Sequence, residues 1–302
     1  MCKVIAFANQ KGGVTKSTST ENIGIGLARL GKKVLLIDAD GQGSLTASLG
    51  FRNPDSMEVT LPTILERIIE DEEVNRNEGL LVLEEGIYLM PCNIELSALE
   101  VSMSNVMRRE YILKEYVDMQ REYFDFILID CMPSLGMITV NALTAADSVI
   151  IPVQASYLPI KGLEQLIKSI SMVKKHLNPS LGVDGILISM VDERTRFSKD
   201  IIELLKENYG NAIHIFKSMI PKSVRAEEST AEGISIYKHD PNGNFCIVSI
   251  SAGAFFSILQ LWIVSFDTLI ASAIFCSASL IRKLFFFWYV SKKRWNTEKS
   301  KE

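Results

Sequence analysis

Histidine and paired cysteine are both scarce in this chain of 302 residues. There are 3 histidines, and the 5 cysteines form no C-x-x-C pair: Cys2, Cys92, Cys131, Cys246 and Cys276. Without such a pair and without a histidine-rich neighbourhood, the sequence gives little support for a metal site or a disulfide framework, and a reducing compartment, the cytoplasm, fits best. A secretion signal is not expected either, because an apolar strand begins at about residue 3.

Most of the chain has no excess of positive over negative charge. The formal net charge is −4. Seven Lys and Arg against three acids give +4 from Phe245 onward, which leaves −8 for residues 1–244. Such an acidic body excludes a protein coated with charge for binding nucleic acid, so any contact with DNA has to come from a local patch.

A glycine and lysine loop follows the first apolar run, Val4 to Phe7, and leads into a helical pattern. Backbone N–H groups of such a loop, the positive end of the helix and a lysine ammonium can all point at one polyphosphate. The Ser17 hydroxyl then lies where it can bind Mg²⁺. If φ is positive at Thr15, the loop stores about 1–3 kcal/mol of strain. The expected cradle is Gly12, Gly13, Val14, Thr15, Lys16, Ser17 and Thr18.

The loop departs from the common G-x-x-x-x-G-K-[ST] pattern in a specific way. Gln10 and Thr15 occupy the two outer glycine positions, and Lys11 stands five residues before Lys16. In these residues the loop resembles the deviant Walker A motif of the ParA/MinD superfamily. The resemblance implies ATP and Mg²⁺ as cofactors, catalytic roles for Lys11 and Lys16, and a homodimer in which Lys11 reaches the partner's phosphates.

The second motif follows the apolar run Val34–Ile37. Asp38 and Asp40 emerge there, at the edge of a parallel sheet where ligands bind. The segment resembles the family's switch I, written D-x-D-P-Q-G, with Gly41 in place of the proline. The resemblance makes Asp40 the residue that positions the attacking water, and we expect the replacement of proline to loosen the loop.

The third motif is an acid after four apolar residues, Phe126–Ile129, which is the Walker B arrangement for Mg²⁺. That acid is Asp130. The expected ligands of the metal are therefore Ser17, Asp38 and Asp130. An iron–sulfur reductase with the same motifs would need cluster cysteines that we cannot place, and a bacterial tyrosine kinase would need a terminal tyrosine cluster.

Apolar runs alternate with helical patterns up to about residue 236. The runs 34–37, 126–129, 148–153 and 185–190 read as buried strands, and 16–30, 160–177 and 197–208 as helices. This alternation predicts an α/β fold with a doubly wound, mostly parallel sheet, similar to P-loop NTPases. The acidic segment Glu66–Glu78 is expected to be a solvated helical face.

Two further segments resemble partition ATPases of the ParA/Soj type: Asp192 to Arg196 and Ile220 to Arg225. The resemblance, which covers about residues 1–242, implies a slow ATPase stimulated by a ParB-type partner, associated with the nucleoid and binding non-specific DNA as the ATP dimer. It implies nucleotide contact for Pro221 and a DNA-binding surface that includes Lys199. The expected DNA-binding residues are Arg194, Arg196, Lys222 and Arg225, although such arginines also commonly pair with acids. The alternative is a MinD-like positioning ATPase at a membrane.

The sequence after residue 242 does not fit this resemblance, so we divide the chain into an ATPase domain, 1–242, and a hydrophobic tail, 243–302. Phe245–Phe266 is 22 residues without a charge, and Thr268–Ile281 adds 14 more. These runs are long enough for a membrane hairpin. They also have the composition expected of translation in a shifted frame of an AT-rich gene, and a buried pair of soluble helices is a third reading.

Overall fold

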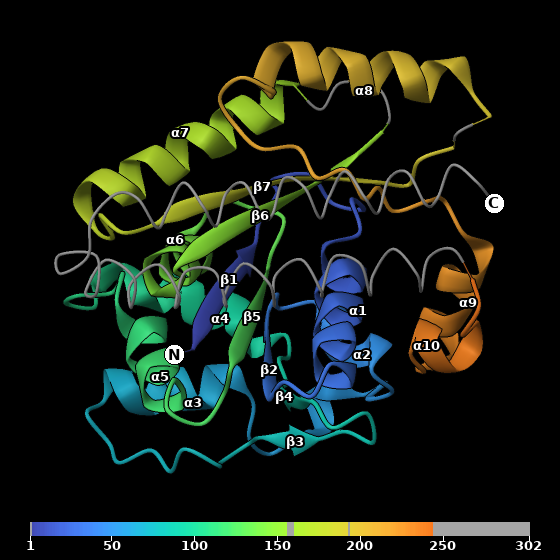
Figure 1. The fold of residues 1–302 in the computed structure, drawn as a ribbon. Helices are drawn as coiled ribbons and strands as arrows, with labels where there is room; N and C mark the ends of the chain where they lie inside the picture. Colours follow the sequence, from blue (N-terminus) through green and yellow to red (C-terminus); the bar gives the residue numbers. More distant parts are fainter. Residues whose placement is uncertain (1, 156–159, 193, 244–302) are drawn as a thin grey trace, which may run out of the picture. The chain divides into compact units, whose positions relative to one another are not determined.

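Strands and helices alternate along the residues that the computed structural model describes, which are 2–155, 160–192 and 194–243. Within them, one sheet has the strand order β3-β4-β2-β5-β1-β6-β7 (Figure 1). All neighbouring pairs are parallel except β3 with β4. The strands are β1 (Lys3–Phe7), β2 (Val34–Ala39), β3 (Leu81–Val82), β4 (Tyr88–Met90), β5 (Phe126–Cys131), β6 (Ser148–Gln154) and β7 (Gly182–Ser189).

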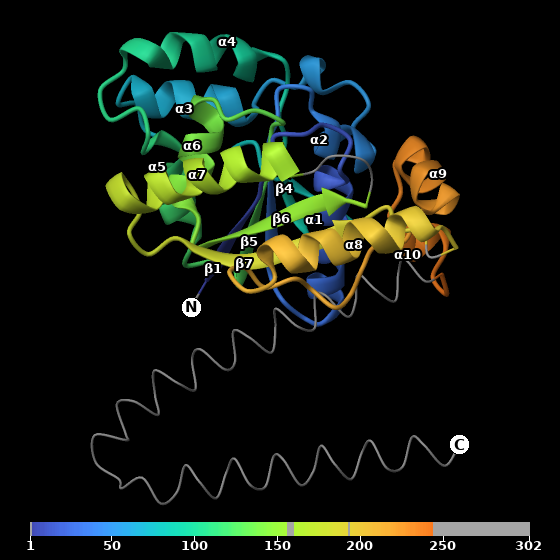
Figure 2. The same ribbon diagram turned by 90° about the horizontal axis from the view of Figure 1, so that it is seen from above.

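Helices cover both faces of this sheet. The α-helices are α1 (Lys16–Arg29), α2 (Ser44–Ser48), α3 (Leu61–Ile69), α4 (Glu95–Ser102), α5 (Ile112–Gln120), α6 (Met137–Ala145), α7 (Ile160–His176), α8 (Arg196–Tyr209), α9 (Val224–Glu232) and α10 (Ile236–His239), and the 3₁₀ turns are Pro54–Ser56 and Met103–Asn105. The helices α3, α5, α6 and α7 lie on one side, and α1, α2, α9 and α10 on the other (Figures 1 and 2). The predicted doubly wound, mostly parallel fold is confirmed.

The central strands are apolar because both of their faces are covered. Every residue of β2 and β5 is buried, so these strands are continuous apolar runs that end in an acid. The register pairs Asp38 of β2 with Asp130 of β5, and Asp130 with Phe7 of β1. The three strands therefore deliver both acids and the loop after β1 to the same edge of the sheet.

The local sequence predicted the end of helix α1 to within one residue, but it predicted too long a helical segment after α3. The helix predicted over 16–30 is α1, which ends at Arg29, and Gly31 follows with φ of 80°, the left-handed conformation that suits a glycine after a helix. The expected helical face over Glu66–Glu78 is wrong beyond α3. That helix ends at Ile69 because the chain turns to a φ of 58° at Asp71, and the Asn75 side chain then accepts from the N–H of Asn77 at 3.1 Å.

The division into 1–242 and 243–302 stays a prediction, because the residues from 244 onward lie outside those that the structure describes. In the part of the chain that is described, no helix has both the length and the apolar character needed to cross a bilayer. The membrane hairpin and the alternatives to it all concern the tail, so they are carried forward as predictions.

Candidate functional site

The loop between β1 and α1 has the open backbone of a phosphate cradle. A side chain added at Gly12 or Gly13 would meet nothing within 4 Å, which leaves room for a group beside the main chain. Gly13 has φ of 70°, and Thr15, the residue before α1, has φ of 66°. A β-branched residue is strained in this left-handed conformation, so the loop does store strain at Thr15.

One cavity of about 460 Å³ joins this loop to α2 and α9. Its lining includes Gly13, Thr15, Lys16, Ser17, Thr18, Met190, Pro221, Glu227 and Thr230. The cavity has the size of a nucleotide pocket, with the lysine and hydroxyls at one end and the apolar Met190 and Pro221 among its other lining residues. Gly12 and Val14 are not among the lining residues of this cavity, so their predicted contact with the nucleotide stays a prediction.

Buried charge gathers behind the cradle. Lys16, Asp38, Asp40 and Asp130 are all less than a tenth exposed. Burial lowers the pKa of Lys16, although the nearby Asp130 opposes that effect. Burial, followed by the neighbouring Asp38, raises the pKa of Asp130 well above its usual range, against smaller opposing effects of Ser17 and Lys16. Asp40 and Asp130 act on the Lys16 ammonium, and Asp38 acts on Asp130, so acids outnumber the cation here and a divalent cation would stabilise their charged forms.

Asp130 fits such a cation directly. Both of its carboxylate oxygens are buried and have no hydrogen-bond partner among the described residues. An orphaned buried carboxylate beside a serine hydroxyl is the donor set that Mg²⁺ accepts through one or two protein ligands. The described residues contain no cluster of three or more metal-ligating side chains, so phosphate oxygens and water have to complete the shell.

Asp38 has a different environment from Asp130. One of its oxygens accepts from the Thr46 N–H at 2.8 Å and from the Thr46 hydroxyl at 2.7 Å, and the other accepts from the Asp40 N–H at 3.2 Å. Burial is the largest cause that raises the pKa of Asp38. The carboxylate therefore fastens α2 to the end of β2, and its predicted role as a metal ligand stays a prediction. Thr46 was missed because nothing in its sequence surroundings marks it.

The segment after Asp38 is closely packed. The N–H of Gln42 donates to Asp40 at 3.0 Å. A Cβ at Gly41 would lie 2.6 Å from the Ser97 hydroxyl, so only glycine fits there without a shift. The missing side chain allows this close approach, and the expectation that Gly41 loosens the loop stays a prediction.

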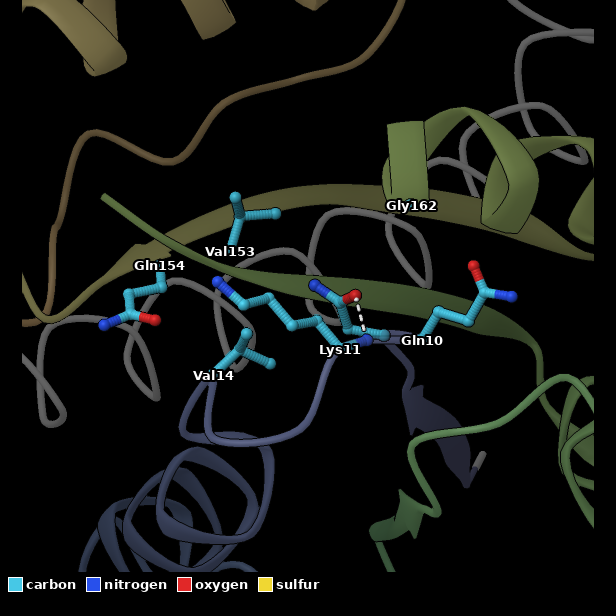
Figure 3. Close-up of a pocket in the computed structure, with 7 residues that line it drawn as sticks. Gln10, Lys11, Val14, Val153, Gln154 and Gly162 are labelled. Carbon is cyan, nitrogen blue, oxygen red and sulfur yellow. Dashed lines mark hydrogen bonds between the residues drawn. The ribbon is translucent and has the colours of Figure 1, made fainter. Parts of the chain in front are cut away.

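Lys11 lies apart from Lys16. Its side chain lines a second cavity, of about 210 Å³, and extends toward Val153 and Gln154 (Figure 3). Its main chain is nevertheless tied to the cradle, because the Lys16 ammonium donates to the Lys11 carbonyl at 3.3 Å. The two lysines thus share a backbone contact while their side chains line different cavities.

The structure brings the two predicted DNA-binding segments together. The N–H of Lys222 donates to the Val191 carbonyl at 3.0 Å, in a bridge that joins 191 and 221. Arg194 pairs with Asp192 and lowers the pKa of that acid, with a weaker effect from Lys222, and Arg225 pairs with Glu228. No ion pair with another described residue holds Arg196, Lys199 or Lys222.

Comparison with known proteins adds sequence relatives to this geometry. A family model described as an AAA domain (AAA_31) matches residues 2–183. The sporulation initiation inhibitor protein Soj of Bacillus subtilis is 38% identical over 245 residues, covering 80% of this chain and 92% of that protein. The chromosome-partitioning ATPase Soj of Treponema pallidum is 35% identical over 240 residues, covering 80% and 91%.

Solved structures share the fold. The cobyrinic acid a,c-diamide synthase of Mycobacterium smegmatis with bound ADP and magnesium is 34% identical, with a TM-score of 0.74, over 87% of this chain and 96% of that one. The septum site-determining protein MinD of Pyrococcus horikoshii, complexed with Mg-ADP, matches at 22% identity and a TM-score of 0.66, over 86% and 98%. The MinD likeness shows the fold alone.

Proposed function

We propose, because this chain belongs to the ParA/Soj family of ATPases, that it is a nucleotide-dependent switch that partitions plasmid or chromosomal DNA. The observation that supports this most strongly is the buried acid cluster behind a phosphate cradle whose second lysine, Lys11, lies in a separate cavity. A kinase that acts as a monomer needs no phosphate-binding lysine outside its own pocket. A switch whose site is completed by a second copy of the chain needs a lysine that can reach the nucleotide of that copy.

The enzyme is an ATPase, and its cofactors are ATP and Mg²⁺. Lys16 and the loop N–H groups hold the phosphates, and Ser17 and Asp130 hold the metal. Pro221 and Met190 line the apolar part of the same cavity, which suits the base. Bound Mg²⁺ neutralises charge that develops on the transferred phosphoryl group.

The remaining chemistry belongs to positioning. Asp40 orients the attacking water, and its own geometry is set by the hydrogen bonds at Asp38 and Gln42. Lys11 reaches the phosphates held by a second copy of the chain. Hydrolysis is then slow in the monomer, depends on dimerisation and is stimulated by a ParB-type partner, which is the behaviour of a timed switch.

The output of the switch is attachment to DNA. Arg196, Lys199 and Lys222 are exposed cations without ion pairs among the described residues, and Arg194 and Arg225 flank them. Such a patch binds phosphates without reading the base sequence, and dimerisation doubles the number of contacts. With this output, the proposed location of the protein is the cytoplasm, on the nucleoid.

The experiment that tests this function measures binding to random-sequence DNA with ATP and with ADP. Binding should need ATP and should weaken steeply with salt. Lys222→Ala should weaken it and reduce the salt slope by about one. Lys206→Ala also removes one positive charge, but from the last turn of α8, outside the proposed patch, and it is the control. Binding that is equal with ADP, or insensitive to salt, contradicts the proposal.

A MinD-like positioning function is the alternative, and it rests on the uncharged run Phe245–Phe266. If Phe245–Val290 is a membrane hairpin, the full chain should fractionate with membranes and resist alkaline extraction. If it results from a frame shift, the chain should collect in aggregates, and restoring the frame should give a soluble protein that binds DNA. We expect the second result.

A further inference from the structure

The side chain of Asn9 joins the phosphate loop to the end of β6. Asn9 is only 7% exposed. Its amide nitrogen donates to the Pro152 carbonyl at 2.6 Å, and its amide oxygen accepts from the Lys11 N–H at 3.0 Å, the bond drawn in Figure 3. Both hydrogen-bonding ends of one buried amide are therefore used on main-chain groups on either side of the loop.

The first of these bonds takes the place of a main-chain hydrogen bond between β1 and β6. The ladder between β1 and β6 pairs Phe7 with Ile150, and the N–H of Ala8 donates to the Ile150 carbonyl at 3.2 Å. In a parallel ladder the next donor would be the N–H two residues later, bonded to Pro152. The Asn9 side chain takes that place, so the main chain can leave the sheet one step early without leaving the Pro152 carbonyl unpaired.

The second bond closes a turn of the Asx type at Lys11. It fixes the peptide group before Lys11, and the carbonyl of the peptide group after it accepts from the Lys16 ammonium at 3.3 Å. With its peptide held in this way, Lys11 extends its side chain beside Val153 and Gln154, in a cavity separate from the one that Lys16 lines (Figure 3).

We propose that Asn9 is a positioning residue for Lys11: it anchors the start of the loop to β6 so that the Lys11 ammonium is presented to a second copy of the chain. The inference rests on the proposed action of Lys11 on the partner's phosphates. An amide is required because the position needs a donor toward Pro152 and an acceptor toward Lys11 at the same time. Alanine removes both bonds, and aspartate keeps only the acceptor.

The test uses the full chain and a non-hydrolysable ATP analogue. Nucleotide affinity is measured by calorimetry, and dimer formation by light scattering over a range of protein concentrations. For Asn9→Ala we expect nucleotide affinity within about threefold of wild type, because α1 still holds Lys16 to Thr18, and dimerisation weakened about tenfold or more. Asn9→Asp keeps the shape and the acceptor but turns a carboxylate oxygen toward the Pro152 carbonyl, so its dimerisation should fall as well, and thermal unfolding checks that both variants fold.

Asn178→Ala is the matched control. The Asn178 amide also donates to main-chain carbonyls, those of Leu143, Thr144 and Ala146, but at the end of α6 and away from the loop. It should lose thermal stability and keep normal dimerisation. A purely structural role for Asn9 would instead lower nucleotide binding and dimerisation together, and that result overturns the inference.

Lys11→Ala separates the inference from its premise. If Lys11→Ala stays monomeric with the analogue and Asn9→Ala dimerises like wild type, the positioning role of Asn9 is wrong while the function of Lys11 stands. If Lys11→Ala itself dimerises normally, the proposed action of Lys11 is wrong and the inference falls with it. Loss of dimerisation in both variants, with nucleotide binding kept, supports both.

Discussion

Thr46 donates both its main-chain N–H and its hydroxyl to the same oxygen of Asp38, at 2.8 and 2.7 Å. The hydroxyl oxygen also accepts from the N–H of Cys92 at 3.1 Å. All three residues are almost fully buried. A single threonine therefore connects β2, the start of α2 and the chain after β4 directly behind the phosphate loop.

Thr46→Val keeps the shape of the side chain and removes its hydroxyl. Asp38 then loses one acceptor bond and the Cys92 N–H is left without a partner, so the free energy of unfolding should fall by about 2–3 kcal/mol. Thr144→Val is the control, since the Thr144 hydroxyl only donates to the Val140 carbonyl within its own helix. Urea denaturation measures both. An equal, small loss for the two variants would show that the Asp38 contact adds no stability.

Glu21 gives a prediction for the dependence of stability on pH. It is 2% exposed, one of its oxygens has no partner, and burial raises its pKa to about 8, against a smaller lowering by Ser48. Between the ordinary glutamate value and pH 8 the folded state binds more protons than the unfolded state, so Glu21 lowers stability as the pH rises through this range.

Glu21→Gln should remove that contribution. The wild type should lose, relative to the variant, on the order of 3 kcal/mol of unfolding free energy between pH 5 and pH 8. Other buried acids titrate in both proteins, so the quantity to measure is the difference between the two. Glu66→Gln, at an exposed position of α3, is the control for the loss of one carboxylate. A difference that is flat with pH for Glu21→Gln would mean that this carboxyl titrates normally.

Thr15 tests the strain in the phosphate loop. Its φ of 66° suits glycine, so Thr15→Gly should raise the free energy of unfolding by about 1 kcal/mol while ATP still binds. Ala98→Gly, at an exposed position in the middle of α4, should do the opposite and cost about 1 kcal/mol. Thermal unfolding separates the two signs. Destabilisation by Thr15→Gly would show that the threonine contacts outweigh the strain.

The sequence predicted the sheet and the position of its acids well, because buried parallel strands read as apolar runs that end at the ligand edge. Asp130 illustrates this, since its strand and its place beside the loop follow from the pattern alone. The sequence also indicated that the loop would be strained if φ were positive at Thr15, but only the backbone could show that it is.

The contacts that depend on tertiary packing were not predictable. Thr46 reaches Asp38 across 8 residues, and Asn9 reaches Pro152 across 143, with no periodic pattern to mark either pair. The acidic segment after Ile69 was misread because its composition suits a solvated helix as well as a loop. The close approach of Ser97 that requires Gly41 depends on how α4 packs, which local sequence does not encode.

Dimerisation driven by nucleotide is the central claim, and the mass of Lys11→Ala in solution tests it most directly. With a non-hydrolysable ATP analogue, wild type should have the mass of a dimer in light scattering, and with ADP the mass of a monomer. Lys16→Ala should bind no nucleotide and stay monomeric. Lys11→Ala should bind the analogue, as calorimetry can verify, and yet remain a monomer. A Lys11→Ala dimer as stable as that of wild type, or a wild type that stays monomeric with the analogue bound, would contradict the account.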